Sequence, residues 1–320
     1  MISIVIPFFN EEESLAILHE EIAHVAQNTG LDLEVIFVDD GSQDGSWQVV
    51  ALLAGKYPRV HGIRLRRNFG KAAALSAGFA AARGDVIMTL DADLQDDPAE
   101  IPNFLLALNL GMDVISGWKK TRHDPWHKVW PSRVFNGLVS WLTGVKLHDH
   151  NSGMKCYRAE IFREIRLYGE LHRFIPVLAA ARGFKVAEVV IKHRSRQFGH
   201  SKYGVRRFVK GFLDLLTVKF LTGFGQRPQH MLGSIGLLSF ALGNLGLVYL
   251  GITWIIRMWH PDLFEPLHQR PLTIYAAVAL LLGAQMMSIG FLAELITAYL
   301  GRDQNSYSIA EKTVDREEND

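Results

Sequence analysis

Short apolar runs alternate with helix-like stretches along the first third of the chain. Three runs have the length and apolar character of buried strands and cover residues 2–9, 33–42 and 85–94, and a further strand is indicated at 60–70. The stretches between them carry apolar residues at helical spacing, as at Leu15, Leu18, Ile22 and Val25. Buried strands that alternate with helices are typical of a parallel sheet covered on both faces. The pattern therefore predicts an α/β fold with a Rossmann-like, mostly parallel sheet.

Two long apolar segments lie near the C-terminus. Residues 231–256 and 272–293 contain no charged residue. Each exceeds the roughly 20 residues that a helix needs to cross a bilayer. A pair of buried globular helices is the alternative, but the length, the lack of charge and the many glycines favour membrane spans.

The stretch before the first apolar segment has a basic and amphipathic pattern. Seven apolar residues fall on one helical face: Val205, Phe208, Val209, Phe212, Leu213, Leu216 and Phe220. Arg206, Arg207 and Lys210 lie off that face. Such a helix beside a span is typical of a segment in the membrane interface, and an ordinary core-facing helix is the alternative. We therefore expect a globular domain (1–204), an amphipathic helix (205–226), two transmembrane helices (231–256 and 272–300) and a polar tail (301–320).

Composition excludes several classes of protein. The 320 residues carry a net charge of +1, so no global field attracts a nucleic acid, and we expect no nucleic-acid partner. Cys156 is the one cysteine, which rules out an internal disulfide and gives no sign of an oxidising compartment. The first apolar run is short and lacks a preceding basic segment, so it indicates a strand and not a secretory signal.

Polar residues follow each of the four predicted strands. Ligands of parallel α/β sheets bind beyond the carboxyl ends of the strands, so these residues are expected to converge on one site. They are Pro7, Asn10, Glu11 and Glu12, then Asp39, Asp40, Gly41 and Ser42, then Asn68, Gly70 and Lys71, and finally Asp91, Asp93 and Gln95.

The acidic cluster after the fourth strand suits a divalent cation. Asp91, Asp93 and Gln95 supply oxygen ligands, and Mg²⁺ or Mn²⁺ bound there would complete its shell with water and substrate phosphates. Such a cation would neutralise a departing diphosphate. Asp39 or Asp40 can accept a hydrogen bond from a base N–H or a ribose hydroxyl. A short Asp-x-Asp motif is weak by itself, because solvated turns also collect aspartates.

The ordered set of motifs carries more weight than any one of them. IVIPFFNEEE, VDDGSQDGS, RNFGKAAAL and LDADLQDDP occur in this order, and together they resemble family 2 inverting glycosyltransferases of the GT-A fold. The later HDPWHKVWPSRVFN, DHNSGMKCYR, LHRFIPVLAA and GHSKYG resemble the polyprenyl-phosphate glycosyltransferases. That group includes dolichol-phosphate mannose synthase and bacterial relatives with two C-terminal membrane helices. The resemblance covers about residues 2 to 300.

The resemblance implies a role for specific residues. Nucleotide contacts are implied for Pro7, Asn10, Glu12, Asp39, Asp40 and Lys71. The metal is implied at Asp91, Asp93 and Gln95, of which the two aspartates are also the catalytic candidates. Acceptor-phosphate contacts are implied among Arg122, Arg133, Arg196 and Lys202. Some relatives carry an extra acid directly after the Ser-Gly pair, where this chain has Met154.

The expected activity is metal-dependent, inverting transfer of a sugar from a UDP- or GDP-sugar to a membrane polyprenyl phosphate. The expected location is a bacterial inner membrane with the catalytic domain in the cytoplasm, and glycines in the spans permit a homo-oligomer. A phosphate acceptor needs little help from a base, so Asp149 is expected to position the site or to serve only as a buried turn carboxylate. The alternatives are a processive polysaccharide synthase, which usually carries a Q-x-x-R-W motif, and a non-catalytic membrane scaffold. The nearest string, GQRPQH, lacks the tryptophan.

Overall fold

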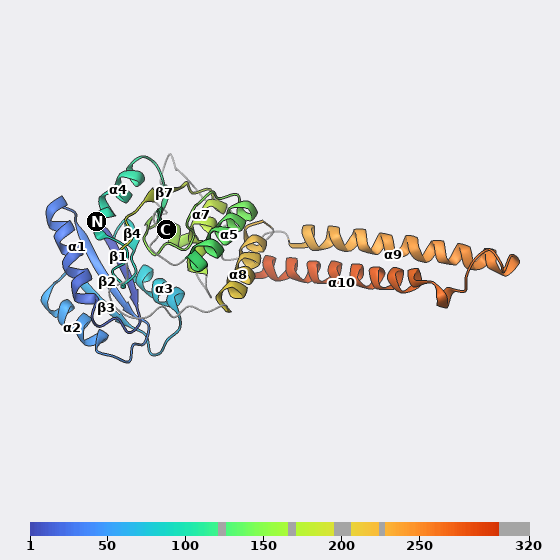
Figure 1. Ribbon diagram of the computed structural model, residues 1–320, viewed down its shortest axis with the longest axis horizontal. Helices are drawn as coiled ribbons and strands as arrows, with labels where there is room; N and C mark the ends of the chain where they lie inside the picture. Colours follow the sequence, from blue (N-terminus) through green and yellow to red (C-terminus); the bar gives the residue numbers. More distant parts are fainter. Residues whose placement is uncertain (121–125, 166–170, 195–205, 224–227, 301–320) are drawn as a thin grey trace, which may run out of the picture. The chain divides into compact units, whose positions relative to one another are not determined.

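The computed structural model describes residues 1–120, 126–165, 171–194, 206–223 and 228–300. The chain divides into two compact units, Met1–Val218 and Lys219–Asp320. The first unit holds the sheet and the second holds two long helices (Figure 1).

The first unit is built on a seven-stranded sheet with the order β3-β2-β1-β4-β6-β5-β7. Its strands are β1 (Ile2–Phe8), β2 (Leu33–Asp39), β3 (Val60–Arg64), β4 (Val86–Thr89), β5 (Val114–Trp118), β6 (Lys155–Arg158) and β7 (Val186–Val190). Strand β6 runs antiparallel to β4 and β5, and the other neighbouring pairs are parallel. The predicted α/β fold with a mostly parallel sheet is therefore confirmed.

Helices cover both faces of this sheet (Figure 1). One face packs against α1 (Leu15–Thr29), α2 (Ser46–Lys56) and α4 (Ile101–Asn109), and the other against α3 (Lys71–Ala81), α6 (Ile161–Glu164) and α7 (Ile175–Ala181). Burial on both faces explains why the sequence of β1 is almost entirely apolar. Ile4 and Ile6 belong to the first core and Val5 to the second, because successive side chains of a strand point to opposite faces. Two short 3₁₀ turns, η1 (Pro98–Glu100) and η2 (Leu171–Phe174), precede α4 and α7.

A third, smaller core joins the last helices of the first unit. Helix α5 (Trp126–Thr143) contributes Val139, and α8 (Arg206–Gly223) contributes Leu215 and Val218. Phe174 and Val177 complete the contact. Other apolar residues of α8, such as Phe212, Leu213 and Leu216, remain exposed.

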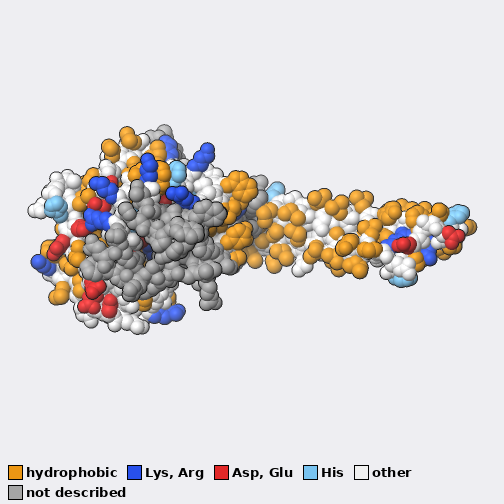
Figure 2. Space-filling model, viewed as in Figure 1, with side chains coloured by type: hydrophobic (Ala, Val, Ile, Leu, Met, Phe, Trp, Pro, Cys, Tyr) orange, Lys and Arg blue, Asp and Glu red, His pale blue; other side chains and the backbone are white. Residues whose placement is uncertain are grey.

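The second unit is a hairpin of α9 (Pro228–Trp259) and α10 (Pro271–Leu300), with the 3₁₀ turn η3 (Leu267–Gln269) between them. Both helices are long and apolar enough to cross a membrane. Close packing depends on glycines: a Cβ on Gly243 would lie 2.6 Å from the Leu280 nitrogen, and one on Gly283 would lie 2.4 Å from the Phe240 nitrogen. Hydrophobic side chains cover the outer surface of this hairpin, and charged ones gather at its loop (Figure 2).

Candidate active site

The loops after β1 and β2 are tied together by side chains that the sequence predicts as nucleotide contacts. Asn10, which has a positive φ of 55°, donates its backbone N–H to Ser42 Oγ at 2.9 Å, and its own Oδ1 accepts from the Gln43 N–H at 2.9 Å. Glu12 Oε2 accepts from the Gly45 N–H at 2.9 Å. These residues shape the strand-end loops. Pro7 is buried inside β1 opposite Val38.

Asp39 lies at the end of β2 and is fully buried. Its Oδ1 accepts from the Ser42 N–H at 2.7 Å, and Oδ2 forms an ion pair with Arg64 Nε at 3.2 Å. Oδ2 accepts no hydrogen bond within the described part of the chain. A cavity of about 510 Å³ lies beside this pair, and we call it the base cavity. It is lined by Phe9, Gly41, Ser42, Gln43, Arg64, Leu65, Arg66, Arg67 and Asn68.

Asp40 holds the loop that leads into α3. Its carboxylate accepts from the backbone N–H groups of Phe69 at 2.7 Å and Gly70 at 3.0 Å. Burial raises the pKa of Asp40, and these two hydrogen bonds act against that rise. Gly41 has a φ of 78°, and a Cβ there would lie 2.6 Å from the Arg67 carbonyl carbon. Asp40 and Gly41 thus fix the wall of the base cavity formed by residues 64–68.

Asp91 and Lys71 form an ion pair where β4 ends and α3 begins. Burial alone would raise the pKa of Asp91, but the positive charge and hydrogen bond of Lys71, together with the charge of Lys119, lower it to about 2. The Asp91 carboxylate is therefore ionised at neutral pH. Gly153 packs directly against it, because a Cβ at that position would lie 2.3 Å from Asp91 Oδ2.

Asp93 and Gln95 continue the loop after Asp91. Leu94 between them has a positive φ of 59°, and the Gln95 N–H donates to Asp93 Oδ1 at 3.2 Å. Within the described residues, no three His, Cys, Asp or Glu side chains converge to hold a metal by themselves. One ionised carboxylate, a second nearby and an amide fit a cation that takes its remaining ligands from water and phosphate oxygens, which is the preference of Mg²⁺.

Two residues that act on Asp91, Lys155 and His172, were not predicted from the sequence. Lys155 on β6 is buried and donates to the His150 carbonyl at 3.0 Å. Burial and the charge of Lys71 lower its pKa to about 7. Burial also lowers the pKa of His172 to about 2, so this ring is neutral. Asp149 is buried and accepts from the Asn151 N–H at 3.1 Å, which is the turn geometry that the sequence left open. No local pattern marks Lys155, because it lies in a short strand far along the chain.

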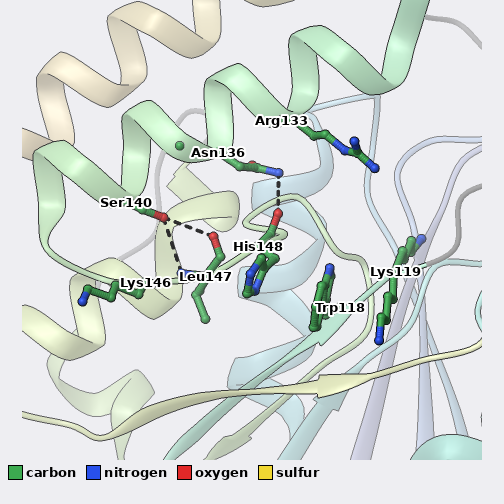
Figure 3. Close-up of a pocket in the computed structure, with 10 residues that line it drawn as sticks. Trp118, Lys119, Arg133, Asn136, Ser140, Lys146, Leu147 and His148 are labelled. Carbon is green, nitrogen blue, oxygen red and sulfur yellow. Dashed lines mark hydrogen bonds between the residues drawn. The ribbon is translucent and has the colours of Figure 1, made fainter. Parts of the chain in front are cut away.

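A second cavity, of about 470 Å³, opens beside α5, and we call it the cationic cavity (Figure 3). It is lined by Trp118, Lys119, Lys120, Arg133, Asn136, Gly137, Ser140, Lys146, Leu147 and His148. Four of these side chains are basic, and among the described residues no Asp or Glu lines the cavity. Arg133 was predicted to contact an acceptor phosphate. Arg122, Arg196 and Lys202 lie outside the described residues.

The walls of the cationic cavity are held rigidly. The His148 ring stacks on Trp118 with centroids 4.0 Å apart, and His148 Nδ1 lies 2.7 Å from Glu188 Oε2. Asn136 donates its side-chain N–H to the His148 carbonyl at 2.9 Å (Figure 3). Ser140 donates to the Leu147 carbonyl at 3.1 Å. The cavity therefore combines an aromatic and aliphatic wall with several cations.

Comparisons with known proteins agree with this geometry. The family described as Glycosyl transferase family 2 matches residues 3–166. Dodecaprenyl-phosphate galacturonate synthase of Rhizobium johnstonii is 40% identical over 314 residues, which cover 95% of this chain and 90% of that protein. Undecaprenyl-phosphate 4-deoxy-4-formamido-L-arabinose transferase of Edwardsiella ictaluri is 33% identical over 306 residues, with 95% and 90% covered.

The fold is also found among solved structures. Glucosyl-3-phosphoglycerate synthase from Mycobacterium tuberculosis, crystallised with Mn²⁺, uridine diphosphate and phosphoglyceric acid, superimposes with a TM-score of 0.53 at 18% sequence identity. The match covers 69% of this chain and 78% of that one. This likeness shows the GT-A fold, as the motifs led us to expect. The family match and the long, similar relatives establish that the chain belongs to glycosyl transferase family 2.

Proposed function

We propose that the protein transfers a sugar from a UDP-sugar to a membrane polyprenyl phosphate, with inversion at the anomeric carbon. The observation that carries the proposal is the cationic cavity beside the Asp91 loop. A phosphate monoester on an isoprenoid chain is both anionic and apolar, and the cavity offers Arg133 and Lys119 together with Trp118 and Leu147. Arginine suits a phosphate because its planar fork donates two hydrogen bonds at once.

The relatives support the same acceptor. The two curated proteins described above are named for dodecaprenyl phosphate and undecaprenyl phosphate, and the alignments cover nearly the whole of this chain. Their sugars differ, so the acceptor class is the shared property. We extend that class to this chain and leave the sugar open.

We place the donor diphosphate at the Asp91 loop. Asp91, Asp93 and Gln95 would hold Mg²⁺ or Mn²⁺, which supplies positive charge to the departing diphosphate. The structural relative with Mn²⁺ and uridine diphosphate is consistent with this placement. Lys71 lies against Asp91, so its ammonium is available to a phosphate oxygen once a cation takes over that carboxylate.

The base cavity favours uracil over guanine. Asp39 is buried and does not itself line the cavity, but it pairs with Arg64, which does. Its Oδ1 is already occupied by the Ser42 N–H, so we propose that Oδ2 becomes the acceptor when a base enters beside the Arg64 donor. Uracil presents one N–H between two carbonyl oxygens, which matches one acceptor flanked by a donor. Guanine presents two neighbouring N–H donors, which would need both carboxylate oxygens. A UDP-sugar is therefore the proposed donor.

The chemistry needs no strong base. A phosphate monoester has a second pKa of about 6 and is largely ionised at neutral pH. Its oxygen attacks the anomeric carbon, the bond from that carbon to the UDP oxygen breaks, and the electron pair leaves with UDP. In this scheme Asp149 positions the site, since its buried carboxylate is engaged in a turn.

The proposed membrane location rests on exposed apolar residues of α8 and on the apolar hairpin. On α8, Phe212, Leu213 and Leu216 are 47%, 56% and 46% exposed, although Leu215 on the same helix is buried. A helix with an exposed apolar stripe is suited to lie in a membrane interface. With the hairpin of α9 and α10 as the anchor, we place the protein in a bacterial inner membrane with its catalytic unit in the cytoplasm.

The proposal is tested with membranes from cells that express the protein. The membranes are incubated with a panel of radiolabelled UDP- and GDP-sugars, and lipids are extracted. We expect label in the lipid fraction from at least one UDP-sugar and none from GDP-sugars. Membranes that express Asp39→Asn should lose most of this label, while label from a GDP-sugar alone would contradict the proposed donor.

A further inference from the structure

Asp96 connects the predicted metal loop to the cationic cavity. It follows Gln95 directly in the chain, and its carboxylate is buried, with only 1% of the side chain exposed. Oδ1 forms an ion pair with Lys119 Nζ at 2.8 Å. Lys119 comes directly after β5 and lines the cationic cavity beside Trp118. Asp96 of the metal loop therefore contacts Lys119, one of the basic residues that line the cationic cavity.

His193 and Arg194 also fix the position of Asp96. Asp96 forms an isolated β-bridge with His193, whose Nδ1 lies 3.7 Å from Asp96 Oδ1. The next residue, Arg194, donates its backbone N–H to the Gln95 carbonyl at 2.8 Å. The Arg194 guanidinium also pairs with Asp97 at 2.8 Å and with Glu21. Both chain neighbours of Asp96 are thus held in place, Gln95 through its backbone carbonyl and Asp97 through its side chain.

Without Asp96 as its partner, the Lys119 side chain would adopt several conformations. A lysine side chain has many rotamers, and fixing them costs conformational entropy. The charges that act on Lys119 are Asp96 first, then Asp91 and Asp149. Without Asp96, the remaining acidic charges that act on Lys119 are Asp91, which belongs to the donor site, and Asp149. The pairing with Asp96 therefore selects one position for the Lys119 ammonium.

We propose that Asp96 is a positioning residue for the acceptor, which holds the Lys119 ammonium at the wall of the cationic cavity where the lipid phosphate binds. The inference rests on the proposed function, because it takes the cavity as the acceptor site. It makes the affinity for the acceptor depend on the position of one buried carboxylate that belongs to the metal loop. If Asp96 only neutralised the charge of Lys119, moving its carboxylate would not change the affinity for the acceptor.

The test measures binding of farnesyl phosphate, a short polyprenyl phosphate, to the detergent-purified full-length protein by calorimetry. Asp96→Asn should weaken binding on the order of tenfold, the effect expected when one charge-assisted hydrogen bond is misplaced. Binding of UDP with Mn²⁺ should change less than twofold. Asp32→Asn is the control, since it removes an ion pair with Arg59 at the opposite end of the strands and does not contact Asp96, its chain neighbours or Lys119, and it should leave both affinities unchanged.

Two further variants separate positioning from simple charge balance and cover the case in which Asp96→Asn does not fold. Asp96→Glu keeps the charge but moves the carboxylate, so weaker farnesyl phosphate binding at an unchanged melting temperature supports the proposal. The double variant Asp96→Asn/Lys119→Gln removes both charges and should bind no more weakly than Lys119→Gln alone. Unchanged binding by Asp96→Glu, or independent effects of the two substitutions, overturns the inference. If the unaltered protein does not bind farnesyl phosphate at all, the proposed acceptor fails as well.

Discussion

Gly153 leaves room for the Asp91 carboxylate: a Cβ on Gly153 would lie 2.3 Å from Asp91 Oδ2. The two residues are far apart in sequence and meet because β6, which follows Gly153, pairs with β4, which precedes Asp91. The Thr89 hydroxyl donates to the Gly153 carbonyl at 2.8 Å and fixes this approach. The backbone at Gly153 thus forms one wall of the candidate metal site, against the Asp91 carboxylate.

Gly153→Ala should therefore displace the Asp91 carboxylate. A shift of about 1 Å in a reacting geometry can lower a rate on the order of a hundredfold, and we expect a loss of that size in sugar transfer. Gly55→Ala is the control, because a Cβ on Gly55 has no atom within 4 Å. The account is contradicted if Gly153→Ala retains full turnover, as measured by incorporation of labelled sugar into lipid.

Asp93→Asn should preserve the fold and remove most of the activity. The substitution takes one anionic ligand from the predicted metal site, and loss of such an electrostatic group costs roughly a hundredfold or more in rate. Melting temperature and lipid labelling are measured on the same preparation, with and without added Mn²⁺. Full turnover of the variant, or of the unaltered protein in excess chelator, would show that no metal is needed.

The free energy of unfolding should fall in acid because of His150. The ring is fully buried, and burial together with the charge of Lys155 lowers its pKa from 6.5 to about 4. Between these values the unfolded chain binds a proton that the folded protein does not, so the free energy of unfolding falls as the pH drops from 6.5 to 4. The loss is on the order of 3 kcal/mol.

Melting temperatures of the detergent-purified protein across this pH range check the prediction. His150→Gln can keep the contact to Ser140 and cannot take up the proton, so its melting temperature should depend less on pH. Identical pH profiles for the two proteins would show that His150 does not carry the effect.

The hairpin should place residues 258–270 outside and both termini inside the cell. Before the first span the chain carries Lys192, Arg194, Arg196, Lys202, Arg206, Arg207, Lys210, Lys219 and Arg227. The loop between the spans has Arg257 and Arg270, and this asymmetry follows the positive-inside rule. A membrane-impermeant thiol reagent added to intact cells should label Glu265→Cys and not Ala310→Cys. The native Cys156 is buried, so it gives little background. The reverse labelling pattern would refute this topology.

The sequence predicts the nucleotide half of the sheet well, because β1, β2 and β4 are largely apolar strands, and helices of ordinary length separate them and the short β3. It does not predict the place of β6. Lys155–Arg158 is only four residues long and enters the sheet between β4 and β5 through long-range pairing. Strand β5, which precedes Lys119, is missed for a similar reason, since the following stretch is rich in Trp, Lys and Arg and hides the strand end.

The same limit applies to the site. Polar strand ends identify Asp39, Asp91 and Asp93 as candidates, but a list of strand ends does not show which carboxylates are already engaged. Asp40 is occupied by the Phe69 and Gly70 N–H groups, a relationship that depends on how the loop folds back. The Lys119–Asp96 pair likewise joins two loops that no local pattern connects.

The central claim is that the acceptor is a lipid phosphate. The most direct measurement uses the purified protein in liposomes with Mn²⁺ and the labelled UDP-sugar that its membranes use, and compares undecaprenyl phosphate with undecaprenol, which lacks the phosphate. The account predicts a lipid-soluble product that mild acid hydrolyses to free sugar, formed with undecaprenyl phosphate and absent with undecaprenol. A polymer, or a sugar attached to a hydroxyl without any requirement for the lipid phosphate, would contradict it.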